Sequence, residues 1–288
     1  MNKRECRGDT TMNTENFDCY VDVHSHLTDE VFTEDIEKVI SEAKKVGVAA
    51  SLVVAENEHQ YDQVLHLADR FPDFVLPCLG VHPVQGDPTQ ERRSANLQDI
   101  TNTEALIDKH HGRLGAVGEV GLDFTPRFCR EEGDKEMQKL VLTRQVEIAQ
   151  KHDLPLNVHS RSAGRPTIAL LKELGASKVL MHAFDGKPSV GMEGVKAGFY
   201  FSIPPSVTRT EDREKFVRQI PIDHLLLETD APALAPVKQT RNTPSNIVLS
   251  CEYIAKVKKM DPSDVRQITT QNAIKLFPKL ASFLVKRM

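Results

Sequence analysis

The feature that most constrains the fold of this chain is a repeated alternation between apolar runs and segments with helical spacing. Eight apolar runs occur along the 288 residues, and each is followed by a helical pattern of apolar side chains. Most of the runs are continuously apolar, as in strands that are buried on both faces of a parallel sheet. They end near residues 26, 55, 82, 119, 159, 182, 203 and 230. This succession predicts parallel strands that are joined by helices.

Eight such units predict an α/β protein with a TIM-type (β/α)₈ barrel, and the chain has the length of a barrel in a single domain. An open, doubly wound sheet is the structural alternative, but no glycine-rich dinucleotide fingerprint follows the first run. Residues 1–17 are polar and carry charges of both signs, which predicts a disordered N-terminal tail. The barrel is therefore expected over residues 18–288.

Composition limits the classes of partner and the compartment. The net charge is −4, so contact with nucleic acid requires a local basic patch rather than a general positive field. Five cysteines are scattered without a Cys-x-x-Cys pair, which is typical of reduced thiols in an intracellular protein of the cytoplasm or nucleus. No apolar stretch has the length of a membrane span. We expect no membrane association and no obligate protein partner.

The first apolar run ends with two histidines, His24 and His26. Side chains two residues apart in a strand point to the same face, so both imidazoles leave the strand on one side. Neutral imidazole is the commonest protein ligand for zinc-like ions. The pair alone is weak support for a metal site, because this spacing also arises by chance, and matching ligands at other strand ends are needed.

Further donors do stand at the ends of later runs. A single strand-end histidine more often hydrogen-bonds a carbonyl group than binds metal, but the active sites of such barrels lie where the carboxyl ends of the strands meet. The six donors expected to converge there are His24, His26, Glu119, His159, His182 and Asp230. They are too many for one tetrahedral ion, so we expect two ions that share Glu119, roughly 3.5–4 Å apart.

Three neighbours of these donors have expected supporting roles. Gly118 and Gly121 flank Glu119 and are expected to leave room for the ions and a substrate. Asp22 precedes the histidine pair on the same face of the strand, and we expect it to orient one of the ligands.

At this point the sequence resembles the TatD family of metal-dependent deoxyribonucleases, within the amidohydrolase-like barrels. The motifs that carry the resemblance span about residues 20–277 in the order of the family. Two further segments, 158–167 and 201–206, resemble the third TatD-domain-containing paralogue of eukaryotes. The family motifs are Asp22-Val-His-Ser-His26, Gly80-Val-His-Pro83, Gly118-Glu-Val-Gly-Leu-Asp123, Val158-His-Ser-Arg161, Met181-His-Ala-Phe184, Glu228-Thr-Asp-Ala-Pro232 and Arg241-Asn-x-Pro244.

The resemblance implies a two-metal nuclease that acts on DNA. One ion would be held by His24, His26, Glu119 and Asp230, and the other by Glu119, His159 and His182. The ligand types fit zinc, manganese or magnesium. The sequence departs from the family at Thr243, where the motif Arg-Asn-x-Pro usually contains Glu.

The chemistry of such a site agrees with phosphodiester hydrolysis. Two ions activate a water molecule and clamp the attacking and leaving oxygens, with Glu119 as the shared carboxylate and Asp230 as the acceptor of the water's proton. Arg161 and His82 are the expected phosphate contacts. With no Trp and four Tyr, an extended groove for stacked bases is not favoured. This favours exonuclease action on the end of a strand. Together with the resemblance, it gives the expectation of a 3′-to-5′ exonuclease that acts on DNA ends, above all single-stranded ends.

Two alternatives remain at this level. One is an amide- or ester-bond hydrolase of the amidohydrolase superfamily, many of which bridge two ions with a carboxylated lysine in the fourth strand. No Lys lies in that strand here, and Glu119 stands instead. The other is a non-catalytic, metal-stabilised binding protein, which would be expected to lack one or more of the six donors.

Overall fold

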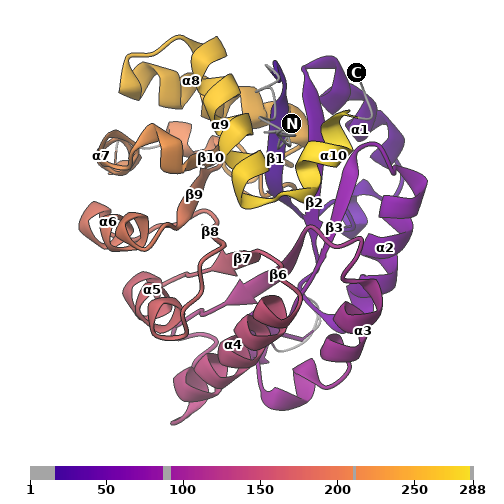
Figure 1. Ribbon diagram of the computed structural model, residues 1–288, viewed down its shortest axis with the longest axis vertical. Coiled ribbons are helices and arrows are strands. Elements are labelled where there is room, and N and C mark those ends of the chain that lie inside the picture. Colours follow the sequence, from indigo (N-terminus) through magenta and orange to yellow (C-terminus); the bar gives the residue numbers. More distant parts are fainter. Residues whose placement is uncertain (1–16, 87–91, 210–211, 286–288) are drawn as a thin grey trace, which may run out of the picture.

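The computed structural model describes residues 17–86, 92–209 and 212–285, and the predicted tail lies outside the described residues except for Phe17. Eight strands form one parallel sheet in the order β1-β2-β3-β6-β7-β8-β9-β10. The sheet curls into a barrel with helices on its outside (Figure 1), which confirms the predicted (β/α)₈ fold. The strands are β1 (Tyr20–Ser25), β2 (Val48–Val54), β3 (Val75–Leu79), β6 (Ala116–Gly121), β7 (Leu156–His159), β8 (Val179–Met181), β9 (Tyr200–Ile203) and β10 (Leu225–Leu227).

The helices bury apolar stripes against these strands. In the first helix, Ile36, Val39, Ile40 and Ala43 form the buried stripe that the sequence predicts. This helix begins at Ile36, after a separate 3₁₀ turn at residues 30–32 that is capped by the Asp29 side chain. The helices are α1 (Ile36–Lys45), α2 (Tyr61–Arg70), α3 (Thr103–His110), α4 (Asp134–Lys151), α5 (Gly164–Glu173), α6 (Pro188–Lys196), α7 (Asp212–Gln219), α8 (Ile247–Lys258), α9 (Pro262–Leu276) and α10 (Lys279–Val285).

Two small elements lie in the loops that follow the carboxyl ends of strands β3 and β9. A two-stranded antiparallel ladder joins β4 (Val84–Gln85) to β5 (Arg93–Ser94) after β3, and the sequence did not predict it. The 3₁₀ turn η4 (Pro205–Arg209) lies between β9 and α7. The ladder therefore follows the strand end that carries the expected phosphate contact His82.

The barrel closes between its first and last strands through backbone hydrogen bonds beyond the regular ladder. The Asp230 N–H donates to the His24 carbonyl at 2.9 Å, and the His26 N–H donates to the Ala231 carbonyl at 2.8 Å. The segment after β10 therefore continues along β1 and carries Asp230 to the histidine pair. Asp230 itself has a φ of 55°, a left-handed conformation that Asp tolerates better than most residues.

Asp22 strengthens this closure. Its carboxylate accepts hydrogen bonds from the N–H and the hydroxyl of Thr229, at 2.9 and 2.6 Å. It also accepts the backbone N–H of His24 at 3.4 Å. The partners of Asp22 are thus a hydroxyl and the backbone groups of His24 and of Thr229, which precedes Asp230, and its expected role in orienting a ligand stays a prediction.

The glycines that flank Glu119 let two strands approach closely. A Cβ on Gly121, whose φ is 143°, would lie 2.0 Å from the His159 carbonyl oxygen, and a Cβ on Gly118 would lie 2.6 Å from the Cβ of Asn157. Only glycine fits this contact between β6 and β7. The space is thus taken by the neighbouring strand, and the expectation that these glycines make room for ions and substrate is wrong.

The opposite end of the barrel is closed by apolar packing. Leu280 and Leu284 of α10 join a buried cluster with Leu52, Leu76 and Leu226 of the strands. The Lys279 ammonium donates to the Leu114 carbonyl, which precedes β6, at 2.6 Å. The helix α10 therefore covers the amino ends of the strands and leaves only the carboxyl ends for a site. Within the described part of the chain, no helix has the length and apolarity to cross a membrane.

Candidate metal centre

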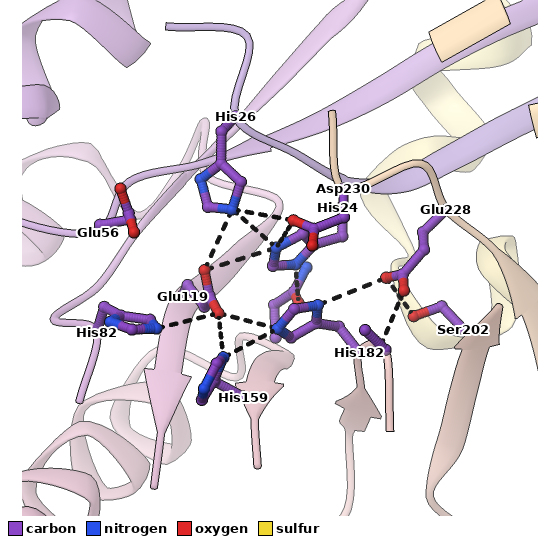
Figure 2. Close-up of polar contacts among 12 residues, drawn as sticks. His24, His26, Glu56, His82, Glu119, His159, His182, Ser202, Glu228 and Asp230 are labelled. Carbon is purple, nitrogen blue, oxygen red and sulfur yellow. Dashed lines mark hydrogen bonds and ion pairs between the residues drawn. The ribbon is translucent and has the colours of Figure 1, made fainter. Parts of the chain in front are cut away.

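The six predicted metal donors and His82 lie together at the carboxyl end of the barrel. They come from, or directly follow, strands β1, β3, β6, β7, β8 and β10, and their polar atoms face a common centre (Figure 2). All are buried except His26, which is partly exposed. The structure therefore gathers His24, His26, His82, Glu119, His159, His182 and Asp230 into one cluster.

The first donor group consists of His24, His26, Asp230 and the Oε2 atom of Glu119. The Nε2 atoms of the two histidines lie 3.2 Å apart. Their distances to Glu119 Oε2 are 3.6 and 3.4 Å, and those to Asp230 Oδ1 are 3.5 and 3.3 Å. For a tetrahedral ion with bonds of about 2.0–2.1 Å, neighbouring ligand atoms lie about 3.3 Å apart. The group therefore has the dimensions of a metal site.

The second donor group consists of His159, His182 and the Oε1 atom of Glu119. Glu119 Oε1 lies 2.8 Å from His159 Nδ1 and 2.9 Å from His182 Nε2, and these two nitrogens are 3.4 Å apart. His82 Nε2 lies 3.6 Å from the same oxygen. Glu119 thus turns one carboxylate oxygen toward each donor group.

Partners outside the cluster fix the tautomers of two of these histidines. The Asn157 amide donates to the Val23 carbonyl at 2.9 Å, which leaves its oxygen to accept from His24 Nδ1 at 2.8 Å. Asp123 Oδ2 accepts from His159 Nε2 at 3.2 Å. In the neutral rings, His24 Nε2 and His159 Nδ1 therefore present lone pairs to the oxygens of Glu119. Acceptors that face acceptors require a cation between them, so these residues fit divalent metals.

Glu228 supports the cluster from the side of His182. Its carboxylate accepts from the Ala183 N–H at 2.8 Å and from the Ser202 hydroxyl at 2.6 Å, and it lies 3.7 Å from His182 Nδ1. No role was expected from the sequence for Asn157, Asp123 or Glu228. Asn157 was detectable in principle, since it is a polar residue inside an apolar strand and shares a face with His159.

The charge balance of the cluster favours bound cations. Burial alone would raise the pKa of Glu119 and that of Asp230, but the surrounding imidazoles hold both below their usual values. Burial would lower the pKa of His26, whereas the hydrogen bond to Asp230 and the charge of Glu119 raise it to about 9. Burial would also lower the pKa of His182, but the charge of Glu119 and its hydrogen bond raise this pKa well above its usual value. Positive charge is therefore held here by protons when metal is absent.

The two predicted phosphate contacts are His82, which belongs to the cluster, and Arg161, which lies beside it. His82 is buried, and hydrogen bonds between Gln145 of α4 and both backbone groups of Val81 hold its loop in place. Burial lowers the pKa of His82, so that its ring is neutral. Arg161 is exposed and lines a cavity of about 300 Å³ that is continuous with His159, His182 and Asp230. Both residues are therefore within the site.

The segment around Thr243 holds the loop that carries Asp230. The Asn242 amide donates to the Thr229 carbonyl at 2.7 Å, and its backbone N–H donates to the Pro232 carbonyl at 2.9 Å. The Thr243 N–H donates to the Asn242 side-chain oxygen at 3.0 Å. The anchoring role of this motif thus rests on Asn242, although the family's usual Glu is replaced by Thr.

Comparison with known proteins places this site in a family. The family model for TatD related DNase matches residues 21–278. Deoxyribonuclease TATDN3 of Homo sapiens is 53% identical over 266 residues, which cover 92% of this chain and 97% of the relative. The 3'-5' ssDNA/RNA exonuclease TatD of Edwardsiella piscicida is 29% identical over 268 residues, or 89% of this chain and 98% of that protein.

A solved structure agrees on the fold. The crystal structure of a TatD homologue from Escherichia coli has a TM-score of 0.80 and 23% sequence identity, and the match covers 90% of this chain and 98% of that chain. The family model, for its part, spans nearly the whole barrel. These findings confirm the predicted resemblance, the barrel and the class of metal-dependent hydrolase. The chain therefore belongs to the TatD-related DNase family.

Proposed function

We propose that this protein is a two-metal deoxyribonuclease that removes nucleotides from DNA ends in the 3′-to-5′ direction. In this proposal, His24, His26, Asp230 and Glu119 Oε2 hold one divalent ion. His159, His182 and Glu119 Oε1 hold the other. The ions are zinc, manganese or magnesium, which are the metals that such nitrogen and carboxylate ligands accept.

The observation that carries the proposal is the position of Glu119. Its two carboxylate oxygens face different donor groups, at 3.4–3.6 Å from the histidines of the first and at 2.8–2.9 Å from those of the second. A carboxylate that bridges two ions needs this orientation. A single ion would occupy one of the two donor groups and leave the other oxygen of Glu119, together with its histidines, without a divalent cation.

The residues of the site then have distinct tasks in phosphodiester hydrolysis. Two bound ions lower the pKa of a water molecule and neutralise charge that develops on the phosphate. Asp230 is a carboxylate with a lowered pKa and accepts the proton of the attacking water. His82 presents a neutral ring to the phosphate, and Arg161 contributes a fixed positive charge. Asn157 and Asp123 orient His24 and His159.

The choice of substrate rests on the relatives and on the shape of the site. The relatives are named as a deoxyribonuclease and as a 3'-5' exonuclease of single-stranded DNA and RNA. The cavity of about 300 Å³ beside the donors lies at the small end of ligand pockets, which span roughly 300–1,000 Å³. It suits one nucleotide at the end of a strand better than a long tract of DNA.

A timed digest tests this proposal. End-labelled single- and double-stranded DNA and RNA are incubated with the protein across a panel of zinc, manganese and magnesium. We expect single-nucleotide shortening from the 3′ end of DNA, fastest on single strands. Endonucleolytic fragments or shortening from the 5′ end would contradict the predicted polarity. Hydrolysis of amide or ester substrates without cleavage of nucleic acid would favour the alternative hydrolase instead.

A further inference from the structure

A cluster of arginines lies in the cavity beside the donor groups, and the site described above does not use it. Arg209 ends η4, and Arg213 lies in α7. Both line the same cavity as His159, His182 and Asp230. Neither residue belongs to a motif that identified the family. We call the part of the cavity around these two side chains the arginine pocket.

Main-chain carbonyls hold both guanidinium groups in place. The Arg213 Nη1 atom donates to the Phe184 carbonyl at 3.0 Å, and the Arg209 Nη2 atom donates to the Ala235 carbonyl. Each arginine has five N–H donors and uses only part of them in this way. The Arg209 Nε atom is buried and has no hydrogen-bond partner. The two side chains are therefore preorganised, with donors left over for a ligand.

The charge in this pocket is not neutralised by the protein. Within residues 17–86, 92–209 and 212–285, no carboxylate forms an ion pair with Arg209 or Arg213. Arg161 and Lys238 also line the cavity, and Asp185 is the acidic residue there outside the donor groups. Half-buried arginines without carboxylate partners are expected to bind an anion, and the planar fork of Arg matches phosphate.

We propose that the arginine pocket is a second phosphate subsite, which holds a phosphate group next to the scissile one. The inference rests on the proposed nuclease function, because the donor groups must bind the scissile phosphate first. The apolar side chains of Phe184, Val207 and Phe216 line the same cavity, so the sugar and base between the two phosphates contact an apolar wall. The subsite thereby makes recognition depend on two consecutive phosphates rather than one.

Two sources supply such a phosphate, and the substrate distinguishes them. One is the internal phosphodiester on the 5′ side of the scissile bond, and the other is a phosphate at the 3′ terminus. We measure kcat/KM for metal-loaded wild-type protein on short oligonucleotides in which the internal group is replaced by a neutral methylphosphonate. A second pair of oligonucleotides carries either a 3′-hydroxyl or a 3′-phosphate.

The same substrates are then given to Arg209→Gln/Arg213→Gln. Charged hydrogen bonds of this kind change kcat/KM by about 10- to 100-fold. We expect one of the two substrate changes to alter kcat/KM by this factor in the wild type and by less than about 2-fold in the double variant. An arginine-dependent effect of the methylphosphonate identifies the internal phosphodiester as the bound group. An arginine-dependent effect of the 3′-phosphate identifies the terminal phosphate. If neither change has an arginine-dependent effect, the subsite does not exist.

Controls separate this inference from folding and from the proposed function. Arg209→Lys keeps the positive charge but loses the planar guanidinium. If this variant keeps part of the substrate-dependent change in kcat/KM, the charge contacts a phosphate and does not merely tether the Ala235 carbonyl. Arg165→Gln is the matched control, because Arg165 pairs with Glu193 at 2.8 Å and does not line the cavity. Thermal unfolding of each variant checks the fold.

A binding measurement tests the subsite if the wild-type protein cleaves none of the substrates. In that case the proposed function fails, and the subsite is tested by anisotropy with a labelled deoxynucleoside 3′,5′-bisphosphate and metal-loaded protein. Weaker binding to Arg209→Gln/Arg213→Gln than to wild type would still support the subsite. Equal binding to both proteins would overturn it.

Discussion

The two donor groups share Glu119 but differ in how they are held without metal. In the first group, the Nε2 atoms of His24 and His26 lie 3.2 Å apart and 3.3–3.6 Å from the carboxylate oxygens of Glu119 and Asp230, as around an ion. In the second, Glu119 lies within hydrogen-bonding distance of His159 and His182, at 2.8 and 2.9 Å. In the second group, protons on the histidines can therefore form hydrogen bonds to Glu119 and neutralise its charge in place of a metal ion. In the first group, the longer distances make this less effective. We therefore expect the first group to bind metal more tightly.

The supports of the two groups differ as well. The first lies at the closure between the ends of β1 and β10 and is anchored by the neutral amide of Asn157. The second rests on two adjacent strands, β7 and β8, and on the carboxylates of Asp123 and Glu228. Carboxylates behind a histidine raise its basicity, which favours both protons and metal ions. Competition between protons and metal should therefore be stronger in the second group.

Removal of the shared residue has the largest expected effect. Glu119→Gln keeps the size of the side chain but cannot bridge two ions, so we expect nuclease activity to fall by about 10³-fold or more. Metal analysis of the purified variant should show loss of both ions. Glu193→Gln is the control with the same change, because Glu193 lies on α6 and pairs with the exposed Arg165. Near-normal activity of Glu119→Gln would contradict the prediction that Glu119 is a ligand of both ions.

Loss of one ligand from each group tests their independence. His26→Ala and His182→Ala should each lose one ion and lower activity by at least about 100-fold. Since the first group is expected to be the tighter one, His182→Ala should retain its remaining ion more firmly than His26→Ala. Titration with zinc followed by calorimetry measures the difference, and His59→Ala is the exposed control. The reverse order of affinity would contradict the comparison.

Substitution of the outer supports should give a smaller, group-specific effect. Asn157→Ala is expected to weaken metal binding in the first group, and Asp123→Asn in the second, by about 10- to 100-fold each. The measurement is metal affinity at each group, resolved with the single-ligand variants His182→Ala and His26→Ala as backgrounds. Equal weakening of both groups by either change would show that they act as one unit.

The smallest expected effect is a dependence of stability on pH. The pKa of His26 is about 9 in the metal-free fold, above its unfolded value of about 6.5. Its contribution to the stability of the metal-free protein is therefore complete below pH 6.5 and lost as the pH rises through 9. Metal-loaded protein lacks this proton. The difference in Tm between loaded and metal-free protein should grow from pH 6.5 to 9, and a constant difference would refute this view.

Much of the fold and of the site followed from the sequence because both depend on local patterns. The apolar runs mark strands, and a residue such as His159 or Asp230 is placed at the barrel mouth simply by coming at the end of one. The positions of the six predicted metal donors and the two predicted phosphate contacts at the barrel mouth could therefore be predicted without knowledge of the register. Their roles as ligands and contacts remain predictions until the measurements above are made.

What escaped prediction depends on which strands touch and how closely. Asn157 orients His24 although the two residues lie 133 positions apart in the chain. Gly121 serves a close contact with β7 instead of making room for ions and substrate, and Asp22 reaches Thr229 across the closure of the barrel. The two pocket arginines follow β9, whose end carries no metal-binding residue. Sequence patterns give strand ends, but not the partner across a strand boundary.

The closure of the barrel has a consequence for when this protein can act. Asp22 and Thr229 are separated by 207 positions, and the first donor group is complete only when the chain beyond β10 has returned to β1. During synthesis on the ribosome, the first donor group therefore cannot assemble until the chain beyond β10 has emerged.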